Sequence, residues 1–141
     1  MSRIRTEYVD TGKVRFVYKH FAILGPESSR AAEASECAAE QGEFWVYHDI
    51  VFEDQQSAHS SLNQKRLVEL AEEIGLDNTA FSECLTSNKY SLQISRESQA
   101  VQALGVRGTP GFLVNGLFIS GAQPFDVFQQ IIEEQLAAGE G

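Results

Sequence analysis

The pair Asn115-Gly116, set between two short apolar runs at residues 112–114 and 117–120, constrains the fold more than any other feature. A two-residue hairpin turn needs positive φ at both central positions, and Asn-Gly adopts it at the lowest cost. The pair therefore predicts an antiparallel hairpin. A second β-branched and aromatic run at residues 14–18 predicts a further strand. An all-α fold would leave both unexplained, so we predict an α/β protein with helices on the faces of a sheet.

The rest of the chain has the three- and four-residue spacing of amphipathic helices. The sequence predicts helices over residues 2–9, 26–41, 43–54, 63–74 and 90–104, a short helix after Asp77, and a last helix from Pro124. Residues 55–61 are polar and predict a loop. The 43–54 helix is apolar almost all round, so we expect it to be deeply buried, with Trp45 and His48 in the core. Leu104 is expected to face inward.

Length and charge narrow the possible functions. The chain has 141 residues, which suits one domain, and a net charge of −9, which disfavours binding to nucleic acid or anionic lipid. The longest uncharged stretch, about residues 108–125, is broken by glycines and prolines, so no membrane insertion is expected. The first ten residues lack an apolar segment, so we expect no signal peptide in this chain and leave its localisation open.

The two cysteines, Cys37 and Cys84, form no C-x-x-C pair. Three interpretations stay open: separate buried thiols, a structural disulfide between two helices, or a catalytic pair. A bridge would close about 47 residues and contribute about 4 kcal/mol in the chain-entropy model. Neither cysteine lies at a helix start or beside a cation that would stabilise a thiolate, which argues against catalysis.

The sequence gives no sign of a metal or cofactor. His20, His48 and His59 lack metal-ligand spacing, and there is no glycine-rich phosphate loop or nucleophile-elbow motif. We therefore expect neither a metal nor a cofactor. Taken alone, Gly-Thr-Pro at residues 108–110 predicts an ordinary turn with a trans proline, since only about 5 to 6% of such bonds are cis.

Four segments, in their order along the chain, resemble the DsbA-like thioredoxin family: V9-D-T-G-K-V-R-F-V-Y-K-H-F21, A31-A-E-A-S-E-C-A-A-E-Q-G-E-F-W45, F81-S-E-C-L-T-S-N-K-Y90 and V106-R-G-T-P-G-F-L-V-N-G116. The resemblance implies one thioredoxin-like domain over residues 1–141, with the thioredoxin part at about 1–24 and 105–141 and a helical insertion at about 25–104. It also implies a cis proline. In this family the loop that matches Thr109 and Pro110 faces the catalytic C-x-x-C and binds extended segments of thiol-containing proteins.

The sequence departs from the family pattern at its start. In the family, a strand and the C-x-x-C precede the segment that resembles residues 9–21, so we expect a thioredoxin-like fold that is incomplete at the N-terminus and has no catalytic residue. Two functions remain open: a thiol-disulfide oxidoreductase whose present chain is inactive alone, and a redox-inactive peptide-binding or assembly module. Without the central strand the sheet has open edges, which predicts a homo-oligomer, most simply a dimer. The family suggests a bacterial extracytoplasmic location.

Overall fold

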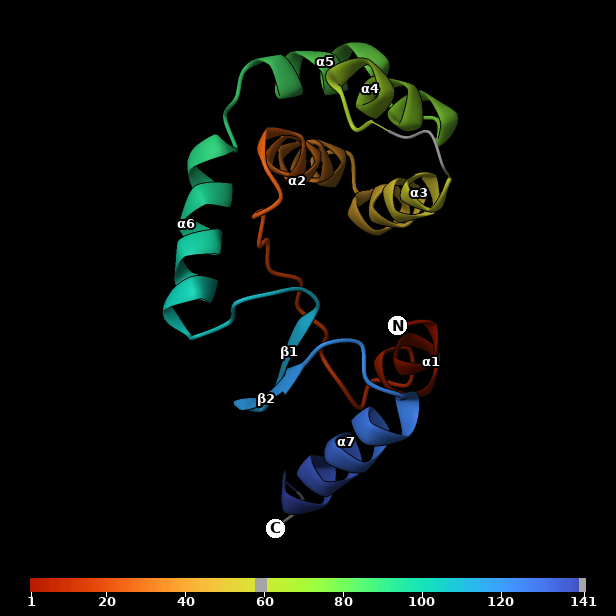
Figure 1. Ribbon diagram of the computed structural model, residues 1–141. Coiled ribbons are helices and arrows are strands. Elements are labelled where there is room, and N and C mark those ends of the chain that lie inside the picture. The colour runs from red at the N-terminus through yellow and green to blue at the C-terminus, as the bar shows by residue number, and fades with distance from the viewer. Residues whose placement is uncertain (58–60, 140–141) are drawn as a thin grey trace. The chain divides into compact units, whose positions relative to one another are not determined.

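The computed structural model describes residues 1–57 and 61–139. The chain divides into two compact units, which we describe separately (Figure 1). The terminal unit combines Met1–Lys19 with Val101–Gly141, and the helical unit is His20–Ala100.

The helical unit contains five helices: α2 (Pro26–Ala39), α3 (Phe44–Gln56), α4 (Gln64–Glu73), α5 (Asn78–Thr86) and α6 (Ser91–Ala103), of which α6 crosses the unit boundary. Local sequence explains where several of them begin. Pro26 occupies the first turn of α2, directly after Gly25 at φ 91°. The side chains of Asn63 and Asp77 accept hydrogen bonds from the backbone N–H groups of Arg66 and Ala80, which caps α4 and α5.

The core of the helical unit is formed by α2, α3, α4 and α5. Tyr47, Leu67 and Phe81 are fully buried there, and the hydroxyl of Tyr47 donates to the backbone oxygen of Leu67 (2.9 Å). This bond satisfies a buried polar group and ties α3 to α4. Burial raises the pKa of Tyr47 well above its usual value, which keeps the hydroxyl protonated as a donor.

The terminal unit contains α1 (Ser2–Ile4), the π-helical turn η1 (Arg5–Val9), β1 (Gly111–Val114), β2 (Leu117–Ser120) and α7 (Phe125–Gly139). The two strands pair antiparallel, and Asn115 and Gly116 both have positive φ, so the predicted hairpin is confirmed. One face of this hairpin packs on the N-terminal turns and α7. The core of the unit comprises Ile4, Tyr8, Ile119, Phe128 and Ile132.

The prediction of a strand at residues 14–18 is wrong: among the described residues, only β1 and β2 form a ladder. The side chains from 13 to 20 nevertheless alternate, with odd-numbered residues exposed and even-numbered residues partly or fully buried. Such an alternation is the geometry of an extended chain. The segment therefore has the side-chain pattern of a strand but lacks its ladder.

Two predictions about burial are also wrong. In α3, Tyr47 and Val51 are buried, but Val46 is 47% and Phe52 is 55% exposed, so the helix has one outward apolar side. Leu104 lies just after α6 and is 68% exposed. Helical periodicity shows which residues share a face, but the packing of the neighbouring elements decides which face is covered.

A polar cluster on the helical unit gives a testable pH dependence. The hydroxyl of Tyr90 donates to Oε1 of Glu40 (2.6 Å), and Lys89 forms an ion pair with the same carboxylate. The hydrogen bond to Glu40, together with burial, raises the pKa of Tyr90 to about 12, and Lys89 lowers the pKa of Glu40.

Because the folded state favours the protonated phenol, the contribution of Tyr90 to stability is complete below the ordinary tyrosine pKa of about 10. We expect it to be lost between about pH 10 and pH 12. Urea unfolding of the wild type and Tyr90→Phe should show a stability difference at pH 8 that shrinks above pH 10. A difference that stays constant across this window would contradict the assignment.

Candidate functional site

The loop before β1 is held at its ends and open in its middle. Val106 is buried, whereas residues 107 to 111 are all exposed. The backbone N–H of Gly121 donates to the oxygen of Pro110 (2.8 Å), which extends the hairpin pairing by one residue. The peptide bond between Thr109 and Pro110 is cis, the isomer that the resemblance implies. Pro110 is thus fixed to the hairpin.

Thr109 itself makes no hydrogen bond within the described part of the chain. This holds for its backbone N–H, its backbone oxygen and its hydroxyl, and the residue is exposed. A backbone with an open donor and acceptor, next to a fixed residue, can pair with an extended peptide. The sequence pointed to Thr109 only through the resemblance; the open backbone groups are visible only in the structure.

Gly111 keeps this loop close to the hairpin. A Cβ atom at this position would lie 3.1 Å from Cγ1 of Val106 and 3.3 Å from Cε2 of Phe118. Both distances are tighter than ordinary contacts between carbon atoms. The absence of a side chain at Gly111 therefore leaves room for Val106 and Phe118 close to its backbone.

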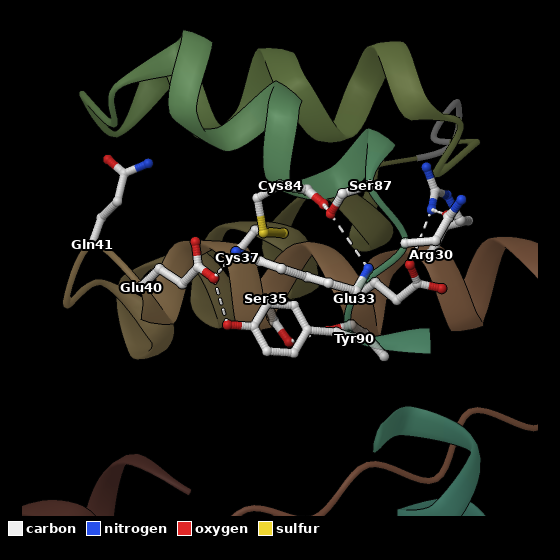
Figure 2. The surroundings of a disulfide bond; sticks show 12 residues. Arg30, Glu33, Ser35, Cys37, Glu40, Gln41, Cys84, Ser87 and Tyr90 are labelled. Atoms are coloured by element: carbon white, nitrogen blue, oxygen red, sulfur yellow. Dashed lines mark hydrogen bonds and ion pairs between the residues drawn. A yellow bond between two sulfur atoms is a disulfide. The ribbon is translucent and has the colours of Figure 1, made fainter. Parts of the chain in front are cut away.

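Cys37 and Cys84 form a disulfide between α2 and α5 (Figure 2). The two residues are only 1% and 6% exposed. A thiol that exchanges with other proteins must be reachable by the attacking or attacked sulfur. Burial therefore places this bond among the structural contacts of the helical unit and apart from disulfide exchange.

The surroundings of the disulfide include a partly buried ion pair, which sequence reasoning missed. Glu33 is 5% exposed and pairs with Arg30 (3.0 Å; Figure 2). The guanidinium of Arg30 also donates to the side-chain oxygens of Asn88 and Gln64. Arg30 thus joins α2 to α4 and to the turn after α5. The contacts of Arg30 with Asn88 and Gln64 are long-range, so local sequence carries no signal for them, whereas Arg30 and Glu33 have the i, i+3 spacing of neighbours on a helix.

His20 and His48 have structural partners. His20 is 4% exposed; its Nε2 lies 2.7 Å from Oε1 of Glu36, and its backbone N–H donates to Glu97 (2.9 Å). Nδ1 of His48 lies 3.0 Å from the carboxylate of Asp49, and its ring packs tilted against that of Phe52, at 4.6 Å between ring centroids. His59 lies outside the described residues.

The described residues contain neither a group of metal ligands nor a membrane-spanning helix. Within residues 1–57 and 61–139, no three histidine, cysteine or carboxylate side chains are grouped so that they could hold a metal ion. In the same ranges, every helix is too short or too polar to cross a bilayer.

Comparisons with known proteins relate this chain to thioredoxin-like proteins. The profile of a protein family described as Thioredoxin matches residues 1–134. The chain is 28% identical to the probable disulfide bond formation protein D of Bacillus cereus, over 96% of this chain and 64% of that protein. It is 36% identical to the Na(+)/H(+) antiporter NhaA 3 of Salinispora tropica, over 80% of this chain but 17% of the antiporter. The chain therefore spans less than two thirds of the length of each of these relatives.

Solved structures agree with the fold. The oxidised form of BdbD from Bacillus subtilis superposes with a TM-score of 0.87 and 25% identity, covering 97% of this chain and 76% of that chain. A thioredoxin-like oxidoreductase from Silicibacter pomeroyi superposes with a TM-score of 0.76 and 26% identity, covering 92% of this chain. The predicted thioredoxin-like fold with a helical insertion is confirmed by these matches. With the family profile covering nearly the whole chain, they establish that it belongs to the DsbA-like family of thiol-disulfide oxidoreductases.

Proposed function

We propose that this chain provides the substrate-binding part of a protein that forms or exchanges disulfides, with the loop at Thr109 and Pro110 receiving extended segments of thiol-containing proteins. The observation that carries the proposal is the open backbone of Thr109 on an exposed loop anchored by Pro110 to the hairpin. Backbone pairing suits varied substrates because it does not depend on their side chains. Relatives named for disulfide bond formation support this substrate class.

The reactive dithiol of such a protein is not among the residues of the printed sequence. Its two cysteines are 47 residues apart and joined to each other in the helical unit. Thiol exchange needs an accessible thiolate. The chain as printed therefore binds substrate segments but does not by itself oxidise or reduce them.

A binding and turnover experiment tests both halves of this proposal. A short extended peptide with one blocked cysteine is expected to shift the NMR amide signals of residues 107–112 and to leave those of the helical unit in place. Thr109→Glu, which puts a charge beside the open groups, should weaken binding several-fold; Thr79→Glu, at an exposed position on α5, is the matched control. Insulin reduction and dithiol oxidation should stay at the background rate.

Two results would contradict the proposal. Equal binding by the Thr109→Glu and Thr79→Glu variants would show that the peptide lies elsewhere. Turnover that survives in a Cys37→Ser/Cys84→Ser variant would show that this chain holds a reactive group other than its cysteines.

The alternative is a redox-inactive module for peptide binding or assembly, including assembly into a homodimer. The observation that favours it is an exposed apolar pair on the hairpin, Leu113 at 55% and Phe118 at 49%, which are partners across the ladder. Sedimentation separates the alternatives, because assembly through this pair would give a dimer that Phe118→Ser dissociates.

A further inference from the structure

The turn between β1 and β2 places a reactive pair of residues, Asn115 and Gly116, at the surface. When glycine follows asparagine, its backbone nitrogen can attack the side-chain carbonyl carbon, because glycine has no Cβ to hinder the approach. Both residues are exposed, with φ values of 47° and 87°. The backbone N–H of Gly116 makes no hydrogen bond within the described part of the chain. The attacking nitrogen is therefore open to water and base.

The side chain of Asn115 is held weakly. Its Nδ2 donates to Oε1 of Gln135 in α7 at 3.4 Å, beyond the usual range of about 2.7–3.2 Å for such bonds. The turn also lies at the end of the ladder, where the pair of Val114 and Leu117 closes it. The ends of an element open at a lower free energy than its middle. The turn can therefore rearrange for the attack without unfolding of the terminal unit.

The other three asparagines of the chain lack these features, since none of them precedes a glycine. Oδ1 of Asn63 accepts a hydrogen bond from the backbone N–H of Arg66 (2.9 Å), and Oδ1 of Asn88 accepts one from Arg30. Asn78 lies within α5, and its Oδ1 is buried. Sequence and structure thus distinguish Asn115 from all of them.

We propose that Asn115 is a site of spontaneous deamidation. The nitrogen of Gly116 forms a bond to Cγ of Asn115, and the bond from Cγ to Nδ2 breaks. The Nδ2 amino group leaves as ammonia, with the proton that the Gly116 nitrogen gives up. Water then opens the cyclic imide at either of its carbonyl carbons, which produces aspartate or isoaspartate. No oxidant or reductant takes part.

The isoaspartate product changes the hairpin. Its backbone runs through the former side chain, so one methylene group is added to a two-residue turn whose length sets the register of the strands. The same hairpin anchors Pro110, whose oxygen accepts a hydrogen bond from the N–H of Gly121 (2.8 Å). Deamidation therefore loosens this anchor and weakens peptide binding at Thr109. This last consequence alone rests on the proposed function.

Peptide mapping of the full chain after incubation in mildly alkaline buffer tests the proposal. The peptide that spans residues 111–120 is expected to gain the mass of an amide-to-acid change and to separate into aspartate and isoaspartate forms. Peptides that contain Asn63, Asn78 or Asn88 should stay unchanged. The reaction should release ammonia and should speed up with rising pH, because the attack needs a deprotonated nitrogen.

Variants at the turn and on α7 make the test specific. Asn115→Gly keeps a residue pair that suits positive φ at both turn positions, and it should not react. Gln135→Ala, which frees the amide, should react several-fold faster than the wild type. Gln130→Ala, at an exposed position of the same helix, is the matched control and should react at the wild-type rate. Incubation should weaken peptide binding by the wild type several-fold and leave that of Asn115→Gly unchanged.

Two outcomes would overturn the proposal. An amide that persists at Asn115 in the folded chain, after the chain in denaturant has lost it, would show that the hairpin protects this residue. Equal conversion of all four asparagines would show that the turn selects nothing. The mass change is measured without any peptide ligand, so a fresh chain that binds no peptide would count against the proposed function alone.

Discussion

Removal of the Cys37–Cys84 bridge is expected to lower the free energy of unfolding of the helical unit by about 4 kcal/mol. The bridge joins residues 47 positions apart, so it excludes many conformations of the unfolded chain. A loss of this size is a large part of the 5–15 kcal/mol that typically stabilises a domain. The double variant Cys37→Ser/Cys84→Ser should therefore unfold at clearly lower urea concentration, with part of the loss arising from burial of two hydroxyl groups.

A comparison of oxidised with reduced wild type isolates the effect of the bridge, and Cys37→Ala/Cys84→Ala, in which alanine adds no polar group, is the control for other effects of the reductant. Dithiothreitol should destabilise the wild type and leave this variant unchanged. Because both sulfurs are buried, reduction should be slow in native buffer and fast in denaturant. Reduction that is equally fast in both conditions would show that the bond is accessible in the folded protein.

The features that local sequence predicted well are those with local causes. Asn115-Gly116 adopts the two positive φ values that the turn demands, whatever the rest of the chain does. Asn63 and Asp77 accept hydrogen bonds from residues three positions later, so the starts of α4 and α5 are encoded within a single turn. Helix positions followed from the same short-range rules.

The wrong predictions depend on partners that local sequence does not reveal. Residues 14–18 have the composition and the side-chain alternation of a strand. A β-strand also needs backbone hydrogen bonds to a second strand, and local sequence does not show whether that strand is there. Phe52 and Leu104 lie at apolar positions of helical patterns, and their exposure reflects which elements pack beside them. The residue types indicated the local conformation, but they did not indicate which elements would pack beside it.

The candidate site residues likewise depend on parts of the chain that lie far away in the sequence. Thr109 and Pro110 came from a resemblance in motif order, because local rules alone predict an ordinary turn there. The Cys37 to Cys84 pairing stayed one of three interpretations, since sequence does not fix how α2 and α5 approach each other.

Phe81→Ala is the second change with a large expected effect, a loss of about 4–5 kcal/mol from the helical unit. Truncating a buried phenylalanine typically costs about 3–5 kcal/mol, and the cost rises when the cavity cannot collapse. Phe81 is fully buried, and its ring lies 5.4 Å from that of Tyr47. Tyr47 cannot readily move into the space because its hydroxyl is bound to Leu67 in α4.

Phe52→Ala is the matched control, since it makes the same truncation at a side chain that is 55% exposed. We expect it to cost less than about 1 kcal/mol. Chemical unfolding of both variants checks the contrast, and similar losses would contradict the burial of Phe81. Phe81→Leu should recover most of the lost stability, because it restores most of the volume.

The two largest predictions are coupled through α5, which carries both Phe81 and Cys84. While the bridge holds α5 against α2, the helix cannot shift to fill the cavity left by Phe81→Ala. Without the bridge, α5 is free to move, and the cavity costs less. The triple variant Phe81→Ala/Cys37→Ala/Cys84→Ala should therefore lose less stability than the sum of its parts, by about 0.5–3 kcal/mol. Strict additivity would mean that α5 is held in place by the rest of the core, with the disulfide acting only on the unfolded chain.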